Sequence, residues 1–307
     1  MQPKVSIQIP TFNQQEFIQK TIESCLMQDY PNLEINIADD HSTDDAYKVI
    51  QPFLVDNRIR YYRNKTNIGR VANYHKALYE YATGEWAINL DGDDYFIDSS
   101  FISKAIELIT TIKDENIVMY QANHDLNKIS GVLPSCIKIN EETLLVDGSG
   151  YFINYYKILH FYHCATIYKR KEALKLGFYT FPCLYTDFNS VAKLFLKGKI
   201  LLSSRTVAYW SRHEQNQSGT LDGKKIANEI GAMNELAVFA STILPAERVE
   251  EWRIKMKGYL LSIYIDLQST AKQKRVALKQ VILNFSLEKT HIRQLLKAML
   301  GSIGINK

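Results

Sequence analysis

Hydrophobic and polar positions in the first 95 residues follow two periods in turn, which predicts strands and helices in regular succession. Apolar residues at every second position, or in short unbroken runs, indicate strands, whereas apolar residues three and four positions apart indicate helices. The predicted strands cover residues 5–9, 33–38, 58–62 and 86–90. The predicted helices between them cover residues 14–28, 42–54 and 70–82, the second capped by Ser42 or Thr43.

This succession predicts an α/β fold with a mixed, mostly parallel sheet flanked by helices, because consecutive parallel strands need a helical crossover. Beyond residue 95 the pattern is less regular. We expect a polar hairpin or loop at 123–150 between helices at 99–112 and 187–197 and strands at 116–121, 164–168, 199–202 and 206–210. After residue 223 the pattern is purely helical, over 224–244, 246–268, 271–285 and 288–301.

Turn residues cluster at 218–223 and mark the expected boundary between two regions. Residues 1–222 would form the α/β domain, and residues 223–307 an all-helical C-terminal appendage. Hydrophobic residues make up 46% of the 307 residues and charged residues 23%, which is typical of a globular protein with a sizeable core.

The cysteine pattern and the hydropathy of the chain exclude several classes of protein. The four cysteines are widely spaced and form no Cys-x-x-Cys pair, so neither a zinc site nor a disulfide framework is expected. Residues 1–4 lead directly into a strand, so we expect no signal peptide. No apolar run reaches about 18 residues, so no membrane span is expected, and a reducing cytoplasm is the expected location.

The positive charge of the chain is concentrated at its C-terminus. Residues 1–222 contain 23 Lys/Arg and 26 Asp/Glu, whereas residues 267–307 contain eight Lys/Arg and one Glu. This favours an anionic partner for the tail, either a membrane surface or a charged polymer, and the alternative is a solvated helix face. An apolar stripe at 291–303 fits either a peripheral membrane contact or a packing surface in a homo-oligomer.

Three carboxylates in four residues stand directly after the predicted strand at 86–90, in Asp91-Gly92-Asp93-Asp94. Carboxylates this close repel one another and are tolerated where a cation or a ligand compensates the charge. Hard oxygen ligands suit Mg²⁺ or Mn²⁺, and Gly92 would let the backbone approach a ligand closely. Haloacid-dehalogenase-type phosphatases also carry two alternating Asp residues at a strand end, and a solvated acidic turn is the structural alternative.

A second acidic cluster, Asp39-Asp40-His41-Ser42-Thr43-Asp44, follows the predicted strand at 33–38. The carboxyl ends of parallel strands meet at one edge of a sheet, where ligands bind. We therefore expect the two clusters to form one site for a metal and a phosphate-bearing ligand. An Asp in this position can accept hydrogen bonds from a base or a ribose, whereas helix capping is the expected role of Ser42, Thr43 and Asp44.

Four sequence pieces in order resemble the N-terminal half of family 2 glycosyltransferases, which have the GT-A fold. The pieces are residues 5–13, residues 37–44, Asn67-Ile68-Gly69, and residues 82–86 leading into the acidic cluster at 91–94. The resemblance covers about residues 3–220. His41 departs from the family pattern, which usually has a small or amide residue there.

The resemblance implies a nucleotide-binding half at residues 1–95 and an acceptor and catalytic-base half at 96–222. It implies that Thr11 and Phe12 flank the base, that Asp40 accepts a hydrogen bond from the base, and that Asp91 holds ribose or sugar hydroxyls. It further implies that Asp93, with Asp94 close by, binds Mn²⁺ or Mg²⁺, and that His213 is a ligand to the metal or to the phosphate. The full set implied for the nucleotide sugar is Pro10, Thr11, Phe12, Asp39, Asp40, Arg70, Asp91, Gly92 and Arg212.

Sugar transfer with inversion at the anomeric carbon, as the resemblance implies, needs a carboxylate that accepts the proton of the acceptor hydroxyl. Asp187 is the candidate, although Thr186-Asp187 replaces the usual Glu-Asp pair and a helix N-cap is the alternative role. The family pattern at Arg212-His213 implies a loop that closes over the diphosphate. Arg70 would neutralise phosphate charge, and its alternative is an exposed arginine at the start of a helix. His163 is a weaker candidate for the acceptor side.

We therefore expect an inverting, metal-dependent glycosyltransferase that moves a sugar from a UDP-sugar to a hydroxyl of a glycan or lipid-linked acceptor in bacterial capsule, lipopolysaccharide or other surface-glycan synthesis. No nucleic-acid partner is expected, whereas residues 267–307 could contact the inner face of the membrane. The alternatives are a metal-dependent phosphatase, a sugar nucleotidyltransferase and a non-catalytic scaffold that binds a nucleotide sugar.

Overall fold

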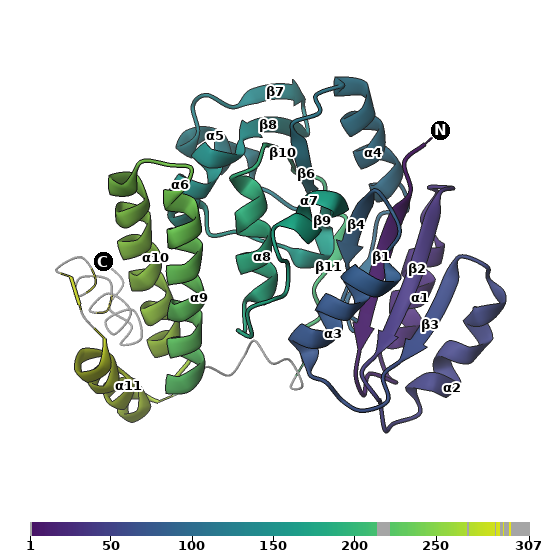
Figure 1. Cartoon of the computed structure of the whole chain (residues 1–307), viewed down its shortest axis with the longest axis horizontal. Helices are drawn as coiled ribbons and strands as arrows, with labels where there is room; N and C mark the ends of the chain where they lie inside the picture. The colour runs from purple at the N-terminus through teal and green to yellow at the C-terminus, as the bar shows by residue number, and fades with distance from the viewer. Residues whose placement is uncertain are drawn as a thin grey trace. The chain divides into compact units, whose positions relative to one another are not determined.

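The computed structural model describes residues 2–213, 222–268, 270–285, 287–288, 291 and 295. It contains a nine-stranded mixed sheet with the order β3-β2-β1-β4-β9-β6-β10-β8-β7, and a small second sheet pairs β5 with β11 (Figure 1). The strands are β1 Val5–Thr11, β2 Leu33–Asp39, β3 Ile59–Arg63, β4 Trp86–Asn89, β5 Tyr95–Phe96, β6 Ile117–Gln121, β7 Ile137–Asn140, β8 Thr143–Asp147, β9 Thr166–Lys169, β10 Lys199–Ser203 and β11 Ala208–Tyr209.

Only β9 and β8 of the large sheet run against the direction of the other strands. This confirms the expected α/β class with a mixed, mostly parallel sheet. The α-helices are α1 Ile18–Leu26, α2 Ala46–Ile50, α3 Arg70–Lys76, α4 Phe101–Ile112, α5 Leu126–Val132, α6 Gly148–Ile158, α7 Arg170–Lys175, α8 Thr186–Phe195, α9 Gly223–Ser241, α10 Ala246–Asp266 and α11 Ala271–Asn284. Short 3₁₀ helices cover Gln51–Val55 and His163–Ala165, and a π-helix covers Ala77–Tyr81.

The strands and helices expected in the first 95 residues are present, with ends shifted by a few residues. The helix expected at 70–82 is α3 followed directly by the π-helix, in which the amide of Ala82 donates to the carbonyl of Ala77. Between residues 96 and 285 the expected strands and helices are present too, and the polar stretch at 123–150 contains the β7–β8 hairpin. The sequence pattern missed α5, α6 and α7.

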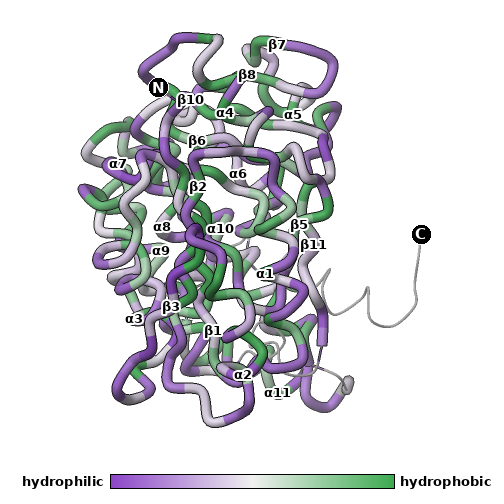
Figure 2. The backbone as a smooth tube through the Cα atoms, turned by 90° about the vertical axis from the view of Figure 1, so that its right-hand side faces the viewer, coloured by the Kyte–Doolittle hydropathy of each residue, from purple (hydrophilic) through white to green (hydrophobic). Residues whose placement is uncertain are grey.

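Apolar side chains of alternate residues on β1 and β2 form the core of the first unit. Val5, Ile7 and Ile9 are fully buried, and they belong to one cluster with residues of α1 and α4. Figure 2 shows this concentration of hydrophobic residues along the strands of the sheet, with hydrophilic residues along the connecting loops. The periodicity of α1 and α4 matches this packing, because both helices bury one apolar face.

The polar residues of the same strands are buried as well, on the opposite face of the sheet. Gln8 of β1 is paired in register with Asn36 of β2 and Asn89 of β4, and all three are at most 1% exposed. The π-helix covers this row, since the side-chain amide of Asn36 donates to the carbonyl of Tyr81 at 3.3 Å. Alternation of polar and apolar residues in β1 therefore reflects two covered faces rather than one exposed face.

The chain divides into two compact units. The first contains both sheets and comprises residues 1–152, 160–180 and 190–212, and the second comprises residues 153–159, 181–189 and 213–307. Helices α6 and α8 each run from one unit into the other. The expected division into residues 1–222 and 223–307 remains a prediction.

The helical C-terminal region expected after residue 223 is present in the second unit. Helix α9 packs on α10, which also contacts α11, and α10 buries Trp252, Leu261 and Ile265. Most of the helix predicted at 288–301, and most of its apolar stripe, lies outside the described residues, as does the segment 214–221.

Candidate functional site

The two acidic clusters lie side by side at one edge of the sheet, because β2 and β4 both pair with β1. The amide of Asp40 donates to the carbonyl of Thr11 at 2.9 Å, and the amide of Gly92 donates to the carbonyl of Pro10 at 3.1 Å. The end of β1 thus holds both clusters by their backbones. This is the carboxyl edge of the parallel strands, where α/β folds bind ligands.

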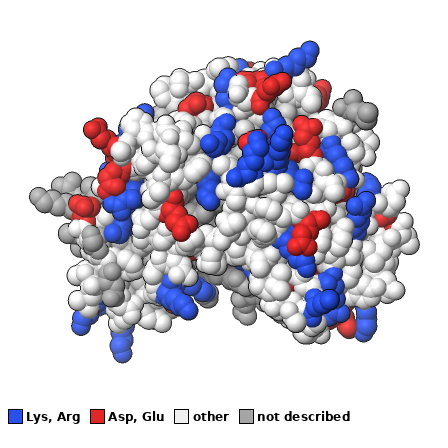
Figure 3. All heavy atoms as spheres, in the orientation of Figure 1, with Lys and Arg blue, Asp and Glu red and all other residues white. Residues whose placement is uncertain are grey.

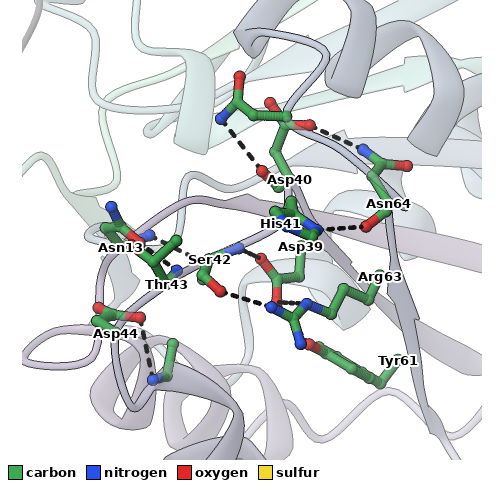
Figure 4. Close-up of polar contacts among 12 residues, drawn as sticks. Asn13, Asp39, Asp40, His41, Ser42, Thr43, Asp44, Tyr61, Arg63 and Asn64 are labelled. Atoms are coloured by element: carbon green, nitrogen blue, oxygen red, sulfur yellow. Dashed lines mark hydrogen bonds and ion pairs between the residues drawn. The ribbon is translucent and has the colours of Figure 1, made fainter.

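Asp39 ends β2 and uses its carboxylate to organise the loop that follows (Figure 4). Its Oδ1 accepts the amide of Ser42 at 2.8 Å, and its Oδ2 accepts the Tyr61 hydroxyl at 2.5 Å. The Arg63 guanidinium lies 3.7 Å from the same carboxylate, whose side chain is 1% exposed. Asp39 is therefore held from β3 as well as from its own loop.

The carboxylate of Asp40 anchors the Asn67-Ile68-Gly69 turn. Its Oδ1 accepts the Asn64 side-chain amide at 2.9 Å and the Ile68 amide at 2.8 Å, and its Oδ2 accepts the Gly69 amide at 2.8 Å. A carboxylate has about four acceptor positions, so three donors leave about one for a ligand. The predicted contact of Asp40 with a base remains a prediction.

His41 has a left-handed backbone conformation with φ of 66°. This conformation suits Gly and Asn, which accounts for a small or amide residue at this position in the resembling family. In this chain a hydrogen bond between His41 Nδ1 and the carbonyl of Asn64, at 3.1 Å, holds the His41 ring in place (Figure 4). The departure at His41 is thus accommodated by Asn64, the residue that directly follows β3.

The expected capping role of Ser42 and Thr43 is wrong, because helix α2 begins at Ala46. Ser42 and Thr43 instead bind Asn13 after β1: the Asn13 amide donates to Ser42 Oγ at 3.0 Å, and the Thr43 amide donates to Asn13 Oδ1 at 2.8 Å. Asp44 accepts the Ala46 amide at 3.1 Å, so it satisfies one backbone donor at the start of the helix. These contacts join the loops after β1 and β2.

Gly92 is required by its own neighbours in the protein. A Cβ atom at this position would lie 2.9 Å from Thr11 Oγ1 and would also meet the side chain of Gln14. The glycine therefore allows the acidic loop after β4 to approach the end of β1. The expectation that Gly92 also serves a ligand remains a prediction.

The carboxylates of Asp91, Asp93 and Asp94 form a group whose closest oxygens all lie within 4.8 Å of one another. Asp94 is 4% exposed, and burial together with the charges of Asp91 and Asp93 raises its pKa well above the usual range for Asp. The Ser211 amide opposes this rise by donating to Asp94 Oδ1 at 2.9 Å. Three hard oxygen donors with mutual repulsion fit a divalent cation such as Mg²⁺ or Mn²⁺.

The bond from Ser211 ties the segment after β11 to the acidic group. In this segment Arg212 stacks over the ring of Trp210 with its guanidinium 4.7 Å from the ring centroid. Phe12 is 44% exposed after β1, and Arg70, the first residue of α3, lies 5.4 Å from the ring centroid of Tyr74. Phe12, Arg70 and Arg212 were predicted to bind the nucleotide sugar. Their contacts with a ligand remain predictions.

Asp187 and His213 belong to the second unit. Asp187 lies in the first turn of α8, which begins at Thr186, so it is not the N-cap of that helix. His213 is half-buried and follows Arg212 directly. The predicted roles of Asp187 as base and of His213 as metal ligand remain predictions.

Three side chains of the site were not singled out from the sequence. Tyr61 and Asn64 hold Asp39 and Asp40, and the Tyr74 hydroxyl donates to Asp91 Oδ1 at 2.5 Å. Tyr74 lies within the helix predicted at 70–82, which the sequence pattern did not connect with the site through this residue. A buried tyrosine needs a hydrogen-bond partner for its hydroxyl. Tyr74 follows shortly after Asn67-Ile68-Gly69, and this position in the sequence is the signal that could have pointed to the site.

The chain belongs to glycosyl transferase family 2, whose family model matches residues 6–177. This is the family that the four ordered pieces of the sequence indicated, and the matched range contains both acidic clusters.

Two curated relatives are similar over part of their length. A Campylobacter jejuni GalNAc(5)-diNAcBac-PP-undecaprenol beta-1,3-glucosyltransferase is 38% identical over 110 residues, which are 34% of this chain and 35% of the relative. The Escherichia coli UDP-Glc:alpha-D-GlcNAc-diphosphoundecaprenol beta-1,3-glucosyltransferase WfaP is 35% identical over 144 residues, 46% of this chain and 55% of the relative. The matches thus span between a third and a little over half of these relatives.

Solved structures with low sequence identity share the fold. S. aureus TarS residues 1–349 in complex with UDP-GlcNAc has a TM-score of 0.64 at 16% identity, over 98% of this chain and 91% of that chain. A mannosyltransferase from Pyrobaculum calidifontis in complex with GDP-Man and Mn²⁺ has a TM-score of 0.55 at 14% identity, over 100% and 89% of the two chains. These likenesses identify the fold of this chain as GT-A.

Proposed function

We propose that the protein transfers a hexose from a UDP-sugar to a hydroxyl group of a lipid-linked glycan, with inversion and with Mn²⁺ or Mg²⁺ as cofactor. The proposal rests mainly on one observation: the end of β1 binds the backbones of both acidic clusters and so holds them together. One of these clusters contains three carboxylates whose closest oxygens lie within 4.8 Å of one another. Such a site offers oxygen ligands for a metal beside acceptors for a nucleoside.

The names of two relatives support this choice of donor and acceptor. Both name a β-1,3-glucosyltransferase and a sugar linked to undecaprenol through a diphosphate, and one names UDP-Glc. A β product formed from an α-linked donor requires inversion at the anomeric carbon. A structural neighbour bound to GDP-Man and Mn²⁺ supports the metal requirement.

The residues of the acidic edge would bind and orient the donor. Transfer breaks the bond between the anomeric carbon and a diphosphate oxygen, and a cation at Asp93 and Asp94 would stabilise the charge that develops on the diphosphate. Asp91 would hold ribose or sugar hydroxyls, and Arg70 and Arg212 would add positive charge for the phosphates. Thr11 and Phe12 would flank the base.

Asp187 would accept the proton of the acceptor hydroxyl as the oxygen attacks the anomeric carbon. This role rests on the resemblance of residues 184–188 to the family segment that carries the base. His213 as an additional metal ligand rests likewise on the family pattern around residues 212–213.

The acceptor proposal includes a peripheral contact of the C-terminal helices with the inner face of the membrane. Among the described residues, no helix combines the length and the apolar content that a bilayer span requires. Helix α11 instead carries basic and apolar side chains together on one exposed face, at Lys272, Arg275, Val276, Lys279, Ile282 and Leu283. Such a helix suits an anionic lipid surface.

The decisive assay measures UDP release by the full chain with Mn²⁺ or Mg²⁺ and a panel of UDP-, GDP- and dTDP-sugars, with EDTA as the control. A short-chain lipid diphosphate that carries GlcNAc serves as acceptor. We expect metal-dependent release from one UDP-sugar, increased by the acceptor. Release unaffected by EDTA, together with no metal-dependent UDP binding in calorimetry, would overturn the proposal.

Variants assign the two carboxylate roles in the same assay. We expect Asp93→Ala to reduce UDP release by about 100-fold or more, because charge on the leaving group is no longer stabilised. Asp187→Asn should reduce transfer comparably but leave UDP binding unchanged. The exposed Asp29 offers matched controls, Asp29→Ala and Asp29→Asn, which should retain activity. Full turnover in both Asp93→Ala and Asp187→Asn would refute the roles.

A further inference from the structure

Helix α3 contacts both acidic clusters. At its start, the Asp40 carboxylate accepts the Gly69 amide at 2.8 Å, and the Asn73 side-chain amide donates to the carbonyl of Ala38 at 2.8 Å. One residue further along the helix, the Tyr74 hydroxyl donates to Asp91 Oδ1 at 2.5 Å. The helix is thus fixed to the loop after β2 and reaches the loop after β4.

The two oxygens of Asp91 have different surroundings. Oδ1 accepts the Tyr74 hydroxyl and, at 3.3 Å, the side-chain amide of Asn89. Within the described part of the chain, no donor contacts Oδ2. One oxygen is therefore held by the protein while the other stays available, in contrast to Asp40, both of whose oxygens accept hydrogen bonds from the protein.

The ring of Tyr74 is packed so that its hydroxyl has a fixed position. Tyr74 is 2% exposed, and its ring makes an edge contact with Tyr179 at a centroid distance of 5.3 Å and a tilted contact with His163 at 5.8 Å. The hydroxyl is a neutral donor, so it orients Asp91 without neutralising the negative charge that the acidic group offers to a cation. A lysine in its place would compete with that cation.

We propose that Tyr74 is a positioning residue that sets the orientation of Asp91 and so directs Oδ2 toward the bound nucleotide sugar. Because α3 is also tied to Asp40, the helix fixes the spacing between the two acidic clusters. The ligand class that such a fixed spacing selects is a nucleoside diphosphate bound with its metal. This inference rests on the proposed function.

The test measures UDP binding to the full chain in Mn²⁺ by calorimetry, with Tyr74→Phe as the variant. The ring contacts remain, whereas a hydrogen bond to a charged group is lost, so we expect the Kd for UDP to rise by about tenfold. The KM for the donor should rise similarly with kcat little changed, as expected when ground-state and transition-state binding weaken together. Tyr30→Phe is the matched control, since Tyr30 is also 2% exposed and its hydroxyl lies 2.5 Å from the carbonyl of Pro3.

A double-mutant cycle separates positioning from a general effect on folding. If Tyr74 acts through Asp91, Tyr74→Phe should have almost no further effect on UDP binding when Asp91→Asn is already present. Three outcomes would each overturn this inference and leave the proposed function intact. The effects of the two substitutions could be additive, or the Kd of Tyr74→Phe for UDP could equal that of the wild type. The third outcome is that Tyr74→Phe unfolds whereas Tyr30→Phe does not. A wild-type chain that binds no UDP in Mn²⁺ would overturn the proposed function and, with it, this inference.

Discussion

At the scale of single residues, five carboxylates of similar chemistry have different environments. Asp40 is surrounded by three donors, Asp91 is held through one oxygen, and Asp94 is buried beside like charges so that its pKa rises. Asp39 is held from β3, and Glu34 lies at the opposite end of β2 in a network of donors. The residue type alone therefore does not define a role; the donors around it do.

Glu34 provides a prediction about pH. Burial of this 3% exposed carboxylate favours its neutral form, but Lys4, Ser6 and Thr83 outweigh burial and lower its pKa to about 2. In the unfolded chain the pKa is about 4.3. A lowered pKa adds stability above the unfolded pKa, and this stability is lost as the pH falls from about 4.3 toward about 2.

We expect Glu34→Gln to lower the free energy of unfolding at pH 7 by about 1–3 kcal/mol. The variant should also lose less stability than the wild type when the pH is lowered from 7 to 3, because it lacks the titrating group. Urea unfolding at both pH values measures the two effects. Glu107, on a solvent-facing position of α4, offers the control Glu107→Gln, which should leave the pH dependence unchanged. Parallel curves for the wild type and Glu34→Gln would contradict the linkage.

At the scale of elements, the sequence predicted strands and helices most accurately where the hydrophobic periodicity was strong. The strands β1, β2 and β4 and the acidic loops after them were located from pattern and residue type alone. Tyr61, Asn64 and Tyr74 could not be assigned to the site in this way, because each lies 17 to 24 residues from the carboxylate that it holds, and only the folded sheet brings them together. Helices α5, α6 and α7 were missed because weak or short apolar patterns resemble loops.

Element contacts also explain how the start of α8 is held. Glu229 of α9 is 1% exposed, and its carboxylate accepts the amides of Leu184 and, at 3.3 Å, Tyr185. These residues directly precede α8, where backbone N–H groups lack partners within the helix. A negative charge is also favourable at a helix start. Glu229 therefore caps, from another helix, the turn that carries Asp187.

We expect Glu229→Gln to reduce the free energy of unfolding by about 1–3 kcal/mol, since one amide donor near the start of α8 loses its charged acceptor. Urea unfolding measures the loss, and hydrogen exchange should show faster exchange of the Leu184 and Tyr185 amides. Glu235→Gln is the matched control, because Glu235 is exposed on the same helix. Unchanged protection of these amides in Glu229→Gln would refute the capping role.

At the scale of the whole molecule, charge is distributed by region. The excess of Lys and Arg lies in the last 41 residues, and the described part of this region includes α11 with four basic and no acidic residues. Figure 3 shows basic side chains that project from α11. The exposed Val276, Ile282 and Leu283 occur among these charges, at 52%, 59% and 71% exposure. Basic and exposed apolar side chains on one helix support the proposed contact with a lipid surface.

This distribution predicts binding to anionic vesicles. The wild-type chain should sediment with vesicles that contain phosphatidylglycerol and should remain in solution with phosphatidylcholine alone. Replacement of Lys272, Arg275 and Lys279 by Gln should weaken binding to anionic vesicles by about 100-fold, at about 1 kcal/mol for each charge near the surface. High salt should have the same effect as the substitutions, because exposed charges are screened.

The matched control replaces three exposed lysines of the first unit, Lys48, Lys138 and Lys171, by Gln and keeps the same net charge change. We expect this control to bind anionic vesicles as the wild type does, because a lipid surface responds to charge gathered on one helix together with apolar side chains. Equal loss in both triple variants would show that net charge alone drives binding, and the contact through α11 would be rejected. Equal binding of the wild type to neutral and anionic vesicles would reject the electrostatic part of the contact.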